Sequence, residues 1–501
     1  MSFLSASHRL EKNWDRLDPD TLKQLQLKQL RQFLKQVVLP FSKHYGELFR
    51  QHSISPDDIQ TWDDLARIPL TSKKNLLTSP EHPDPTKNFV LIPDENKLRR
   101  RPSTIFRALI RGPQGVKAEL EAEYRPILMT STTGRSSEPV PFFYTHHDIE
   151  NLKRSGRRLM EVCESQTDFR HINMFPFAPH LAFWQAHYAG TGFNAFCVST
   201  GGGKVMGTTG NVMLLEKIKP DALIGMPTFI YHVLTEAISE GVHCNTLKRF
   251  VLGGEKVPNG MRRKLRTLAS KLGSNDVEVM ATYAFTESKT AWPECPAHNA
   301  DQSEPSGYHL YPDLGIIEIV DPNSGEPVPD GQPGEIVYTP LDSRGSVILR
   351  YRTGDCISGG ITYEPCPQCG RHCPRLTGRI SRVSDIRRLQ IGKIKGTLVN
   401  FNDLEHILDD IDGLGAWQIE IRKQNDDPME PDEIVVHAQA EDGQSEDQLA
   451  EEITQQFQSD AELRPNRIEF HNTETLKKMQ GVGVSLKEDK IVDHRPKSTK
   501  P

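Results

Sequence analysis

Several short segments of this 501-residue chain carry residue types that bind phosphate groups. The first, residues 129–139, reads MTSTTGRSSEP and places hydroxyls, a glycine and an arginine directly after an apolar run. Backbone N–H groups, Ser and Thr hydroxyls and a cation converge on phosphate oxygens in loops of this kind. The segment therefore predicts a phosphate-binding loop, with an ordinary surface turn as the alternative.

Four later segments add glycines, carboxylates and aromatic rings. Residues 253–256 read GGEK, 281–287 read ATYAFTE, 351–355 read YRTGD and 375–379 read RLTGR. Paired glycines let a backbone approach a ligand closely, although 253–256 could also be a simple strand-to-helix turn. In open α/β sheets, ligands bind at the carboxyl ends of the strands. Asp355 can accept hydrogen bonds from two ribose hydroxyls, and Arg379 suits phosphate or ribose oxygens.

Cysteines are crowded into one part of the chain. Eight cysteines in a chain of this length do not form a disulfide framework. Cys366 and Cys369 form a CxxC pair, which presents two thiolates to one tetrahedral zinc ion. A redox function for this pair would need a thioredoxin-like context, which the neighbouring sequence lacks. A full zinc site would need two further ligands.

The elements that must position these residues are indicated by hydrophobic periodicity. Apolar runs at 171–175, 195–199, 222–226, 249–252 and 277–281 alternate with helical patterns at 210–217, 228–240 and 259–272. Alternating strands and helices predict an α/β fold. A helix is expected over 22–38, and strands over 315–320, 334–339 and 347–351. A small α+β unit follows, with a helix at 401–411 and strands at 417–422, 433–438 and 467–470.

Composition excludes some classes of function. The net charge of −6 gives no reason to expect nucleic-acid binding, and no apolar run reaches the length of a membrane span. The first residues contain no apolar signal region, so a cytoplasmic enzyme is expected. Residues 78–117 are rich in proline and charge and contain a basic run at 97–111. They are interpreted as a surface insert rather than a membrane or nucleic-acid patch.

The order of these segments identifies a resemblance. The hydroxyl-rich loop, GGE, Tyr-x-x-Thr-Glu and YRTGD follow one another as in the adenylate-forming (AMP-binding) enzymes, and the chain is similar to their phenylacetate–CoA ligase family. Residues 45–49 (YGELF) and 65–73 (LARIPLTSK) resemble the opening of that family, and 490–495 (KIVDHR) resemble its ending. The resemblance covers nearly the whole chain except 78–117.

This resemblance implies a fold and a two-step reaction. A large, multi-subdomain α/β adenylation domain would span 1–378, and a small mobile α+β lid domain 379–501. A carboxylic acid, expected to be aryl or apolar, would attack ATP with the help of Mg²⁺, forming an acyl-adenylate and pyrophosphate. A thiol, usually that of coenzyme A, would then displace AMP. The alternatives are transfer to a carrier protein or another acceptor, and a catalytically weak ATP-binding relative. A monomer or homodimer is expected.

The resemblance also assigns functions to individual residues. The pyrophosphate end would be held by Thr130, Ser131, Thr132, Thr133, Gly134 and Arg135, and the nucleotide would also contact Gly254 and Glu255. Tyr283 would lie by the adenine, Thr286 by the phosphate, and Glu287 would hold Mg²⁺. Asp355 would bind the ribose and Arg379 would lie near the hinge. The lysine that reaches the α-phosphate would be Lys487, with Lys477 or Lys478 as alternatives.

Two further sets of residues follow from the family. The acid pocket would be lined by His180, Trp184, Pro227, Tyr231 and Gly253, for each of which core packing is the alternative. A structural zinc ion would be bound by Cys295, His309, Cys366 and Cys369, with His298, His372 and Cys373 as competing ligands. Four protein ligands would close the site, which is typical of structural rather than catalytic zinc.

Some positions depart from the family pattern. Ser131 stands where the loop usually has glycine, Arg135 where it has lysine, and Ala284 where glycine follows the tyrosine. The usual acidic hinge is replaced by 378–382 (GRISR). Arginine keeps the charge of lysine but has a different shape. These departures favour the catalytically weak alternative, whereas the retained Glu287, Asp355 and Arg379 favour an active enzyme.

Overall fold

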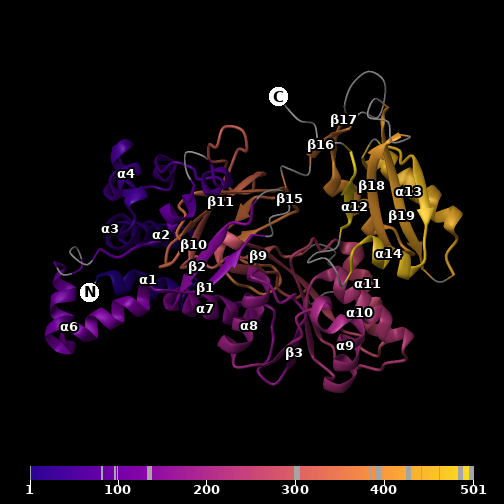
Figure 1. Cartoon of the computed structure of the whole chain (residues 1–501), viewed down its shortest axis with the longest axis horizontal. Helices are drawn as coiled ribbons and strands as arrows, with labels where there is room; N and C mark the ends of the chain where they lie inside the picture. Colours follow the sequence, from indigo (N-terminus) through magenta and orange to yellow (C-terminus); the bar gives the residue numbers. More distant parts are fainter. Residues whose placement is uncertain are drawn as a thin grey trace. The chain divides into compact units, whose positions relative to one another are not determined.

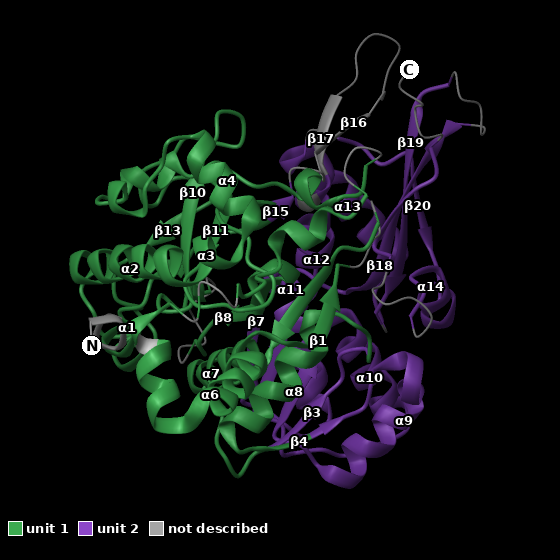
Figure 2. Cartoon of the chain, turned by 60° about the vertical axis from the view of Figure 1, so that its left-hand side comes forward, with its two compact units in different colours: residues 1–169, 177–197, 282–380 green, residues 170–176, 198–281, 381–501 purple. Residues whose placement is uncertain are grey.

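A computed structural model describes most of the chain (Figure 1). The described residues are 2–79, 83–94, 98, 100–132, 138–297, 305–382, 386–389, 397–424, 430–441, 443–461, 463–482 and 489–495. They divide into two compact units (Figure 2). Unit 1 comprises 1–169, 177–197 and 282–380, and unit 2 comprises 170–176, 198–281 and 381–501.

Unit 1 begins with short helices. These are α1 (Ser2–Lys12), α2 (Pro19–Phe33), a π-helical turn (Leu34–Val38), α3 (Leu39–Phe41) and α4 (Lys43–Gln51). The side chain of Asp18 caps α2 by accepting a hydrogen bond from the Thr21 N–H, so the helix begins slightly earlier than the apolar pattern indicated. 3₁₀ turns follow at Pro56–Asp58, Asp63–Arg67, Lys73–Leu76 and Pro85–Phe89.

A long helix, α6 (Pro102–Tyr124), occupies much of the expected irregular insert. Gly112 lies inside it with φ 74°, and Pro113 follows, so the helix is interrupted at this point. Glycine and proline act as helix breakers in sequence patterns, which is why the helix was not expected. Among the described residues, no helix combines the length and apolarity needed to cross a membrane.

The remainder of unit 1 is built from antiparallel strands and two helices. β1 (Pro126–Ser131) pairs with β2 (Pro141–Thr145), and α7 (His146–Val162) and α8 (Leu181–Phe193) follow. β10 (Gly315–Val320), β11 (Gly334–Pro340) and β12 (Tyr351–Ile357) form a second sheet, which β15 (Ile380–Arg382) joins. β9 (Tyr308–His309), β13 (Ile361–Thr362) and β14 (Arg375–Leu376) form a third.

The predicted strand at 347–351 is wrong. Residues 347–350 are buried loop, and β12 begins only at Tyr351. Arg350 has φ 43°, a left-handed conformation that interrupts an extended strand. Val347 and Leu349 are apolar because they are buried beside Tyr45, whose hydroxyl accepts a hydrogen bond from the Leu349 N–H.

The first half of unit 2 is a parallel sheet with crossover helices, as the sequence predicted. β3 (Arg170–Asn173), β5 (Ala222–Gly225), β6 (Arg249–Leu252) and the start of β7 (Glu278–Phe285) pair in parallel, and β4 (Phe196–Ser199) lies beyond β3. The intervening helices are α9 (Gly203–Ile218), α10 (Pro227–Ser239) and α11 (Asn259–Lys271). β5 is buried throughout, as is typical of a parallel strand.

The second half of unit 2 contains a mixed sheet. β16 (Ile386–Leu389) and β17 (Thr397–Asn400) form a hairpin before α12 (Phe401–Asp410). β18 (Leu414–Lys423), β19 (Asp432–Ala440), β20 (Arg467–Phe470) and β21 (Ile491–Asp493) then form a sheet in the order β20-β19-β18-β21. α13 (Glu446–Asp460) and α14 (Thr473–Met479) complete the unit. The α/β fold class is confirmed.

A buried ion pair secures the start of β12. Arg350 donates through Nε and Nη2 to the two carboxylate oxygens of Glu318, at 3.1 and 3.0 Å. Its Nη1 donates to the carbonyl oxygens of Ala66 and Ile68. Both charged side chains are almost fully buried. One arginine therefore joins β10, β12 and the N-terminal region.

We expect Arg350→Leu to lower the free energy of unfolding by about 3–5 kcal/mol, because it leaves the Glu318 carboxylate buried without its partner. Urea unfolding followed by circular dichroism measures the change. The matched control is Arg67→Leu, which removes an exposed arginine beside Asp64 and should cost at most about 0.5 kcal/mol. Equal costs for the two substitutions would contradict this account of Arg350.

Candidate active site

The end of β7 presents an aromatic ring, a hydroxyl and a carboxylate. Tyr283 lies within the strand and is 7% exposed. Its ring stacks on Trp292 with centroids 6.0 Å apart. The chain then turns through a 3₁₀ segment (Thr286–Ser288) that carries Thr286 and Glu287. This turn ends at Lys289, which has a left-handed backbone (φ 56°) and redirects the chain into β8 (Thr290–Pro293).

β12 supplies partners for two of these side chains. The Tyr283 hydroxyl donates to Asp355 Oδ2 at 3.0 Å. The Tyr351 hydroxyl donates to Glu287 Oε1 at 2.6 Å. Two segments about 70 residues apart in sequence are thus joined by two tyrosine–carboxylate hydrogen bonds. Short hydrogen bonds to a carboxylate are stronger than neutral ones, so they fix both acidic groups in place.

Burial raises the pKa of the Glu287 carboxyl above its ordinary value. The hydrogen bond from Tyr351 acts in the opposite direction because it stabilises the charged form, and the charge of Lys73 does the same. The nearby Asp355 carboxylate adds to the rise. A carboxylate with these surroundings gains stability from a cation placed beside it.

The hydroxyl-rich loop is held at both ends by hydrogen bonds. Thr130 is fully buried, and its hydroxyl donates to the Tyr144 hydroxyl at 3.3 Å. The Thr132 N–H donates to the Val140 carbonyl, and Thr132 Oγ1 accepts from the Val140 N–H. The Ser131 N–H donates to the Pro179 carbonyl at 2.6 Å. The predicted Thr133, Gly134 and Arg135 lie outside the described residues.

His180 connects this loop to α8. Its Nδ1 lies 2.9 Å from the Ser131 carbonyl oxygen, which can only accept, so Nδ1 carries the proton. His180 Nε2 is then an acceptor, and it is buried with no hydrogen-bond partner among the described residues. Trp184, the other predicted pocket residue in unit 1, lies one turn along α8 and contacts Phe177 and Phe183 edge to face or tilted.

Gly378 and Arg379 mark the end of unit 1. Gly378 has φ 83°, and a Cβ there would lie 2.5 Å from Ser358 Oγ and 2.6 Å from the Gly359 nitrogen. The Arg379 N–H donates to Ser358 Oγ at 2.8 Å, and its carbonyl accepts from the Ser358 N–H. The Arg379 side chain is exposed. Glycine is therefore required here for the turn that positions the arginine.

Unit 2 holds the remaining predicted pocket and nucleotide residues. Gly253 follows β6, and its N–H donates to the Gly225 carbonyl at the end of β5. Gly254 has φ 81°. Glu255 accepts hydrogen bonds from the N–H and hydroxyl of Thr228 at the start of α10, where a carboxylate favours the helix dipole. Pro227 and Tyr231 lie on the same helix and are buried.

The three candidate lysines differ in their surroundings. Lys487 lies outside the described residues. Lys477 forms an ion pair with Glu236, 3.3 Å away, and Lys478 is exposed.

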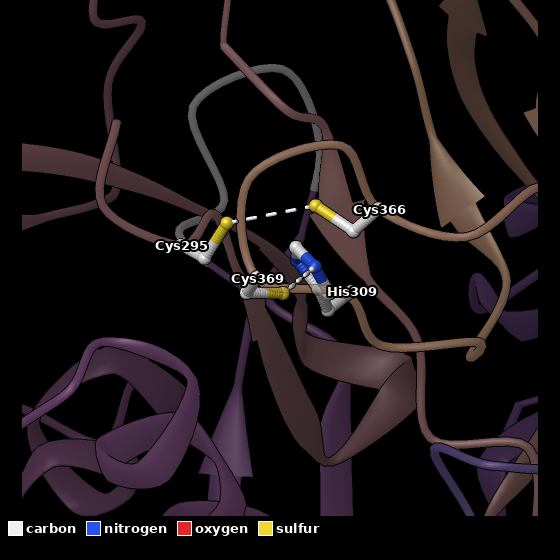
Figure 3. A group of neighbouring side chains, drawn as sticks. All are labelled: Cys295, His309, Cys366 and Cys369. Carbon is white, nitrogen blue, oxygen red and sulfur yellow. Dashed lines mark hydrogen bonds between the residues drawn. The ribbon is translucent and has the colours of Figure 1, made fainter. Parts of the chain in front are cut away.

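Four predicted metal ligands meet in unit 1. Cys295, His309, Cys366 and Cys369 place their ligand atoms within 4.8 Å of one another (Figure 3). Cys295 Sγ lies 3.7 Å from Cys366 Sγ, and Cys369 Sγ lies 3.3 Å from His309 Nε2. A disulfide would need sulfurs about 2.05 Å apart. Zn–S bonds of about 2.3 Å place tetrahedral thiolates roughly 3.7 Å apart, so the spacing fits zinc.

Neighbouring groups support this arrangement. His309 Nδ1 donates to the Pro293 carbonyl at 3.2 Å, which directs Nε2 toward the thiols, as in known zinc sites. Hydrogen bonding from Cys295 lowers the pKa of the Cys366 thiol. Of the competing ligands, His298 lies outside the described residues, and His372 and Cys373 are not part of the four-residue cluster.

Some residues of the site were not expected from sequence. Tyr351 begins the YRTGD segment, yet its bond to Glu287 depends on pairing distant strands. Lys289 is largely buried, and its Nζ lies 3.3 Å from Asp148, the third residue of α7. Burial would raise the pKa of Asp148, but Lys289 and several hydrogen bonds lower it overall. The one sequence signal for the Lys289–Asp148 pair was the presence of a lysine two residues after Glu287.

Comparison with known proteins indicates similarity to AMP-binding enzymes. Residues 165–340 match the model of the AMP-binding enzyme family. The chain is 25% identical to the phenylacetate–coenzyme A ligase of Aromatoleum evansii over 380 residues, which cover 75% of this chain and 74% of that protein. It is 23% identical to that of Escherichia coli K12, covering 78% and 80%. The chain is therefore similar to the phenylacetate–CoA ligases among the adenylate-forming enzymes.

The fold of this chain also matches solved structures. A 2-hydroxyisobutyryl-CoA ligase in the postadenylation state, in complex with R3-HIB-AMP, superposes with a TM-score of 0.72 at 17% identity. The match covers 97% of this chain and 92% of the ligase. The same ligase in the thioesterification state gives a TM-score of 0.60. The shared fold extends over both compact units of the chain.

Two glycines of the site allow a matched test. We expect Gly354→Ala to lower the free energy of unfolding by about 1–2 kcal/mol, because Gly354 has φ 74° but open space around it. Gly378→Ala has the same backbone cost and adds a steric clash with Ser358 and Gly359. This clash should lower the free energy of unfolding by about 1–3 kcal/mol more. Melting temperatures of the two variants measure the difference. Equal melting temperatures would show that Ser358 and Gly359 move aside freely.

Proposed function

We propose that this chain activates an aryl or apolar carboxylic acid with ATP, and that the tyrosine-braced carboxylates Glu287 and Asp355 hold the reacting nucleotide. As an AMP-forming acid–CoA ligase, the enzyme forms an acyl-adenylate and pyrophosphate and then a CoA thioester. The observation that carries the residue assignment is the pair of hydrogen bonds that join β7 and its turn to β12. The cytoplasmic location and the oligomeric state stay predictions.

The first step requires two anions to meet. The substrate carboxylate attacks the α-phosphorus of ATP, the bond to the β-phosphate oxygen breaks, and pyrophosphate leaves. Mg²⁺ supplies positive charge that offsets the repulsion when it is bound. Glu287 fits such a cation because its carboxylate is confined by Tyr351 and is destabilised by burial. Thr286 lies beside it and would contact the phosphate.

The nucleotide would be oriented by a separate set of side chains. Asp355 is positioned by Tyr283 and would accept hydrogen bonds from the ribose hydroxyls. The Tyr283 ring would lie by the adenine. The pyrophosphate loop would begin with Thr130, Ser131 and Thr132 and continue through Arg135. Gly254 and Glu255 would also contact the nucleotide. Arg379 would act near the hinge of a mobile lid at 379–501, with Lys487 reaching the α-phosphate.

The acid would be recognised by aromatic and polar groups. On α8, the rings of Phe183 and Trp184 pack with centroids 5.3 Å apart, and Phe177 joins them. Such rings suit an aryl or apolar acid. His180 Nε2, a buried acceptor, would receive a hydrogen bond from a polar group. Contacts of Pro227, Tyr231 and Gly253 with the acid stay predictions from the family resemblance.

We expect MgATP and one aryl or apolar acid to release pyrophosphate, and AMP formation to depend on coenzyme A. The assay uses purified full-length protein with phenylacetate, benzoate, straight-chain acids and 2-hydroxyisobutyrate. Glu287→Gln should reduce release by roughly 10²–10³-fold because charge stabilisation is lost. The exposed Glu326→Gln is the control. ATP binding without release for any acid would favour a catalytically weak relative, and acyl-AMP that does not react with coenzyme A would favour another acceptor.

The pH dependence tests the Tyr351–Glu287 hydrogen bond. The charged Glu287 carboxylate is present above its pKa and is lost as the pH falls through that value. Tyr351→Phe removes a group that lowers this pKa, so the acid limb of pyrophosphate release should move to higher pH. Tyr363→Phe, a half-buried tyrosine elsewhere in unit 1, should leave the limb in place. If the acid limb of Tyr351→Phe lay at the same pH as in the parent, the ionisation that sets this limb would not be that of Glu287.

A structural zinc ion at Cys295, His309, Cys366 and Cys369 is part of this proposal. Cys366→Ser should reduce the zinc content by about one ion per chain and lower the melting temperature, because bound metal stabilises the folded state. Removal of zinc with a strong chelator should also lower the melting temperature. Cys373→Ser changes a buried cysteine outside the cluster and should keep the ion. Equal zinc contents in the parent and Cys366→Ser would exclude this ligand set.

A further inference from the structure

A second group of potential metal ligands lies on the mixed sheet of unit 2. His437 is on β19, Glu469 is on β20, and His471 directly follows β20. His437 and Glu469 are register partners in the parallel pair, so their side chains lie on the same face. His471 is two residues beyond Glu469 and shares that face. The neighbouring Val436 and Ala438 point into the apolar core on the other face.

The ligand atoms have a spacing that suits one metal ion. His437 Nδ1 lies 3.0 Å from His471 Nε2 and 3.6 Å from Glu469 Oε2. His471 Nε2 lies 4.0 Å from the same Glu469 oxygen. Zinc bonds to nitrogen and oxygen of about 2.0–2.2 Å place tetrahedral ligands roughly 3.3–3.5 Å apart. The three distances bracket that value, so small side-chain adjustments would suffice.

Glu420 on β18 orients the central histidine. Its Oε2 lies 3.1 Å from His437 Nε2. Because a carboxylate accepts, the proton lies on Nε2 and the lone pair of Nδ1 faces His471 and Glu469. Histidines that bind metals usually donate their other ring N–H to a carboxylate in this way. The arrangement accordingly contains three ligands and the outer group that holds one of them.

The surrounding charges and burial also favour a cation. Three carboxylates, those of Glu420, Glu433 and Glu469, outnumber the two arginines near this cluster. Both arginines, Arg422 and Arg467, donate to Glu433, at 3.0 and 2.9 Å. Arg467 is also 3.9 Å from the other oxygen of Glu469, Oε1. The side chains of His437, His471 and Glu469 are 7%, 24% and 39% exposed. The cluster is therefore enclosed on one side and open on the other, which provides an entry path and space for a water ligand.

We propose that His437, Glu469 and His471 form a second metal site, which binds Zn²⁺ or another divalent ion that prefers imidazole ligands. It shares no residue with the cysteine cluster. Three protein ligands leave one position open to water. β20 is the edge strand of its sheet. An ion bound here would link β20 to β19 and, through Glu420, to β18. Zinc would stabilise the sheet against local opening.

The test uses Zn²⁺ alone with the full-length protein. Equilibrium dialysis and elemental analysis should find about one ion fewer per chain in His471→Gln and in Glu469→Gln than in the parent. Both residues are partly exposed, so the variants should fold. Glu420→Gln keeps all ligands and should weaken Zn²⁺ affinity roughly 10–100-fold. His494→Gln is the matched control, since its Nε2 lies near Glu420 rather than among the ligand atoms.

A spectroscopic measurement separates this site from the cysteine cluster. Co²⁺ bound here should absorb through its d–d transitions without the sulfur-to-cobalt charge-transfer band that thiolate ligands produce. His471→Gln should reduce the d–d absorption and keep the sulfur-to-cobalt charge-transfer band. Unchanged zinc content in both His471→Gln and Glu469→Gln would overturn the proposal. So would equal loss in His494→Gln, because the ion would then be bound by a different set of side chains.

Discussion

Two tyrosine–carboxylate hydrogen bonds set the geometry of the candidate active site. Glu287 and Asp355 are acidic groups in a largely apolar setting of aromatic rings, and such groups are costly unless they are hydrogen-bonded. Tyr351 on β12 donates to Glu287 on the turn after β7, and Tyr283 on β7 donates to Asp355 on β12. The two carboxylates are thus kept at fixed positions in the folded chain. Preorganised groups of this kind contribute more to catalysis than mobile ones.

Much of the architecture was predictable from sequence because local patterns determine it. The parallel strands of unit 2 are short apolar runs, and β6 has the predicted bounds 249–252. α6 was missed because Gly112 and Pro113 interrupt a helix that otherwise continues on both sides. The strand predicted at 347–351 was wrong because burial makes a loop as apolar as a strand. Hydrophobicity indicates burial, but it does not distinguish an extended strand from a packed loop.

The candidate site was predictable in its residue types and not in its contacts. The motifs predicted Tyr283, Glu287 and Asp355 as site residues. The hydrogen bonds that position the two carboxylates appear only in the structure. The four-residue cysteine and histidine cluster could be chosen only through resemblance, since Cys295 lies about 70 residues before the CxxC pair. The His437–Glu469–His471 group had no sequence signal at all. Its members meet because two strands pair in one register, and register is a property of the folded sheet.

β7 has a consequence for dividing this protein into fragments. Its residues 278–281 pair in parallel with β6 in unit 2, whereas 282–285 pair antiparallel with β8 in unit 1. One continuous strand therefore belongs to both compact units, and Tyr283 lies just beyond the change. A fragment that ended at residue 281 would keep the β6–β7 pairs, and one that began at residue 282 would keep the β7–β8 pairs. Neither fragment would contain a whole unit, because each unit is assembled from three separate segments of the chain.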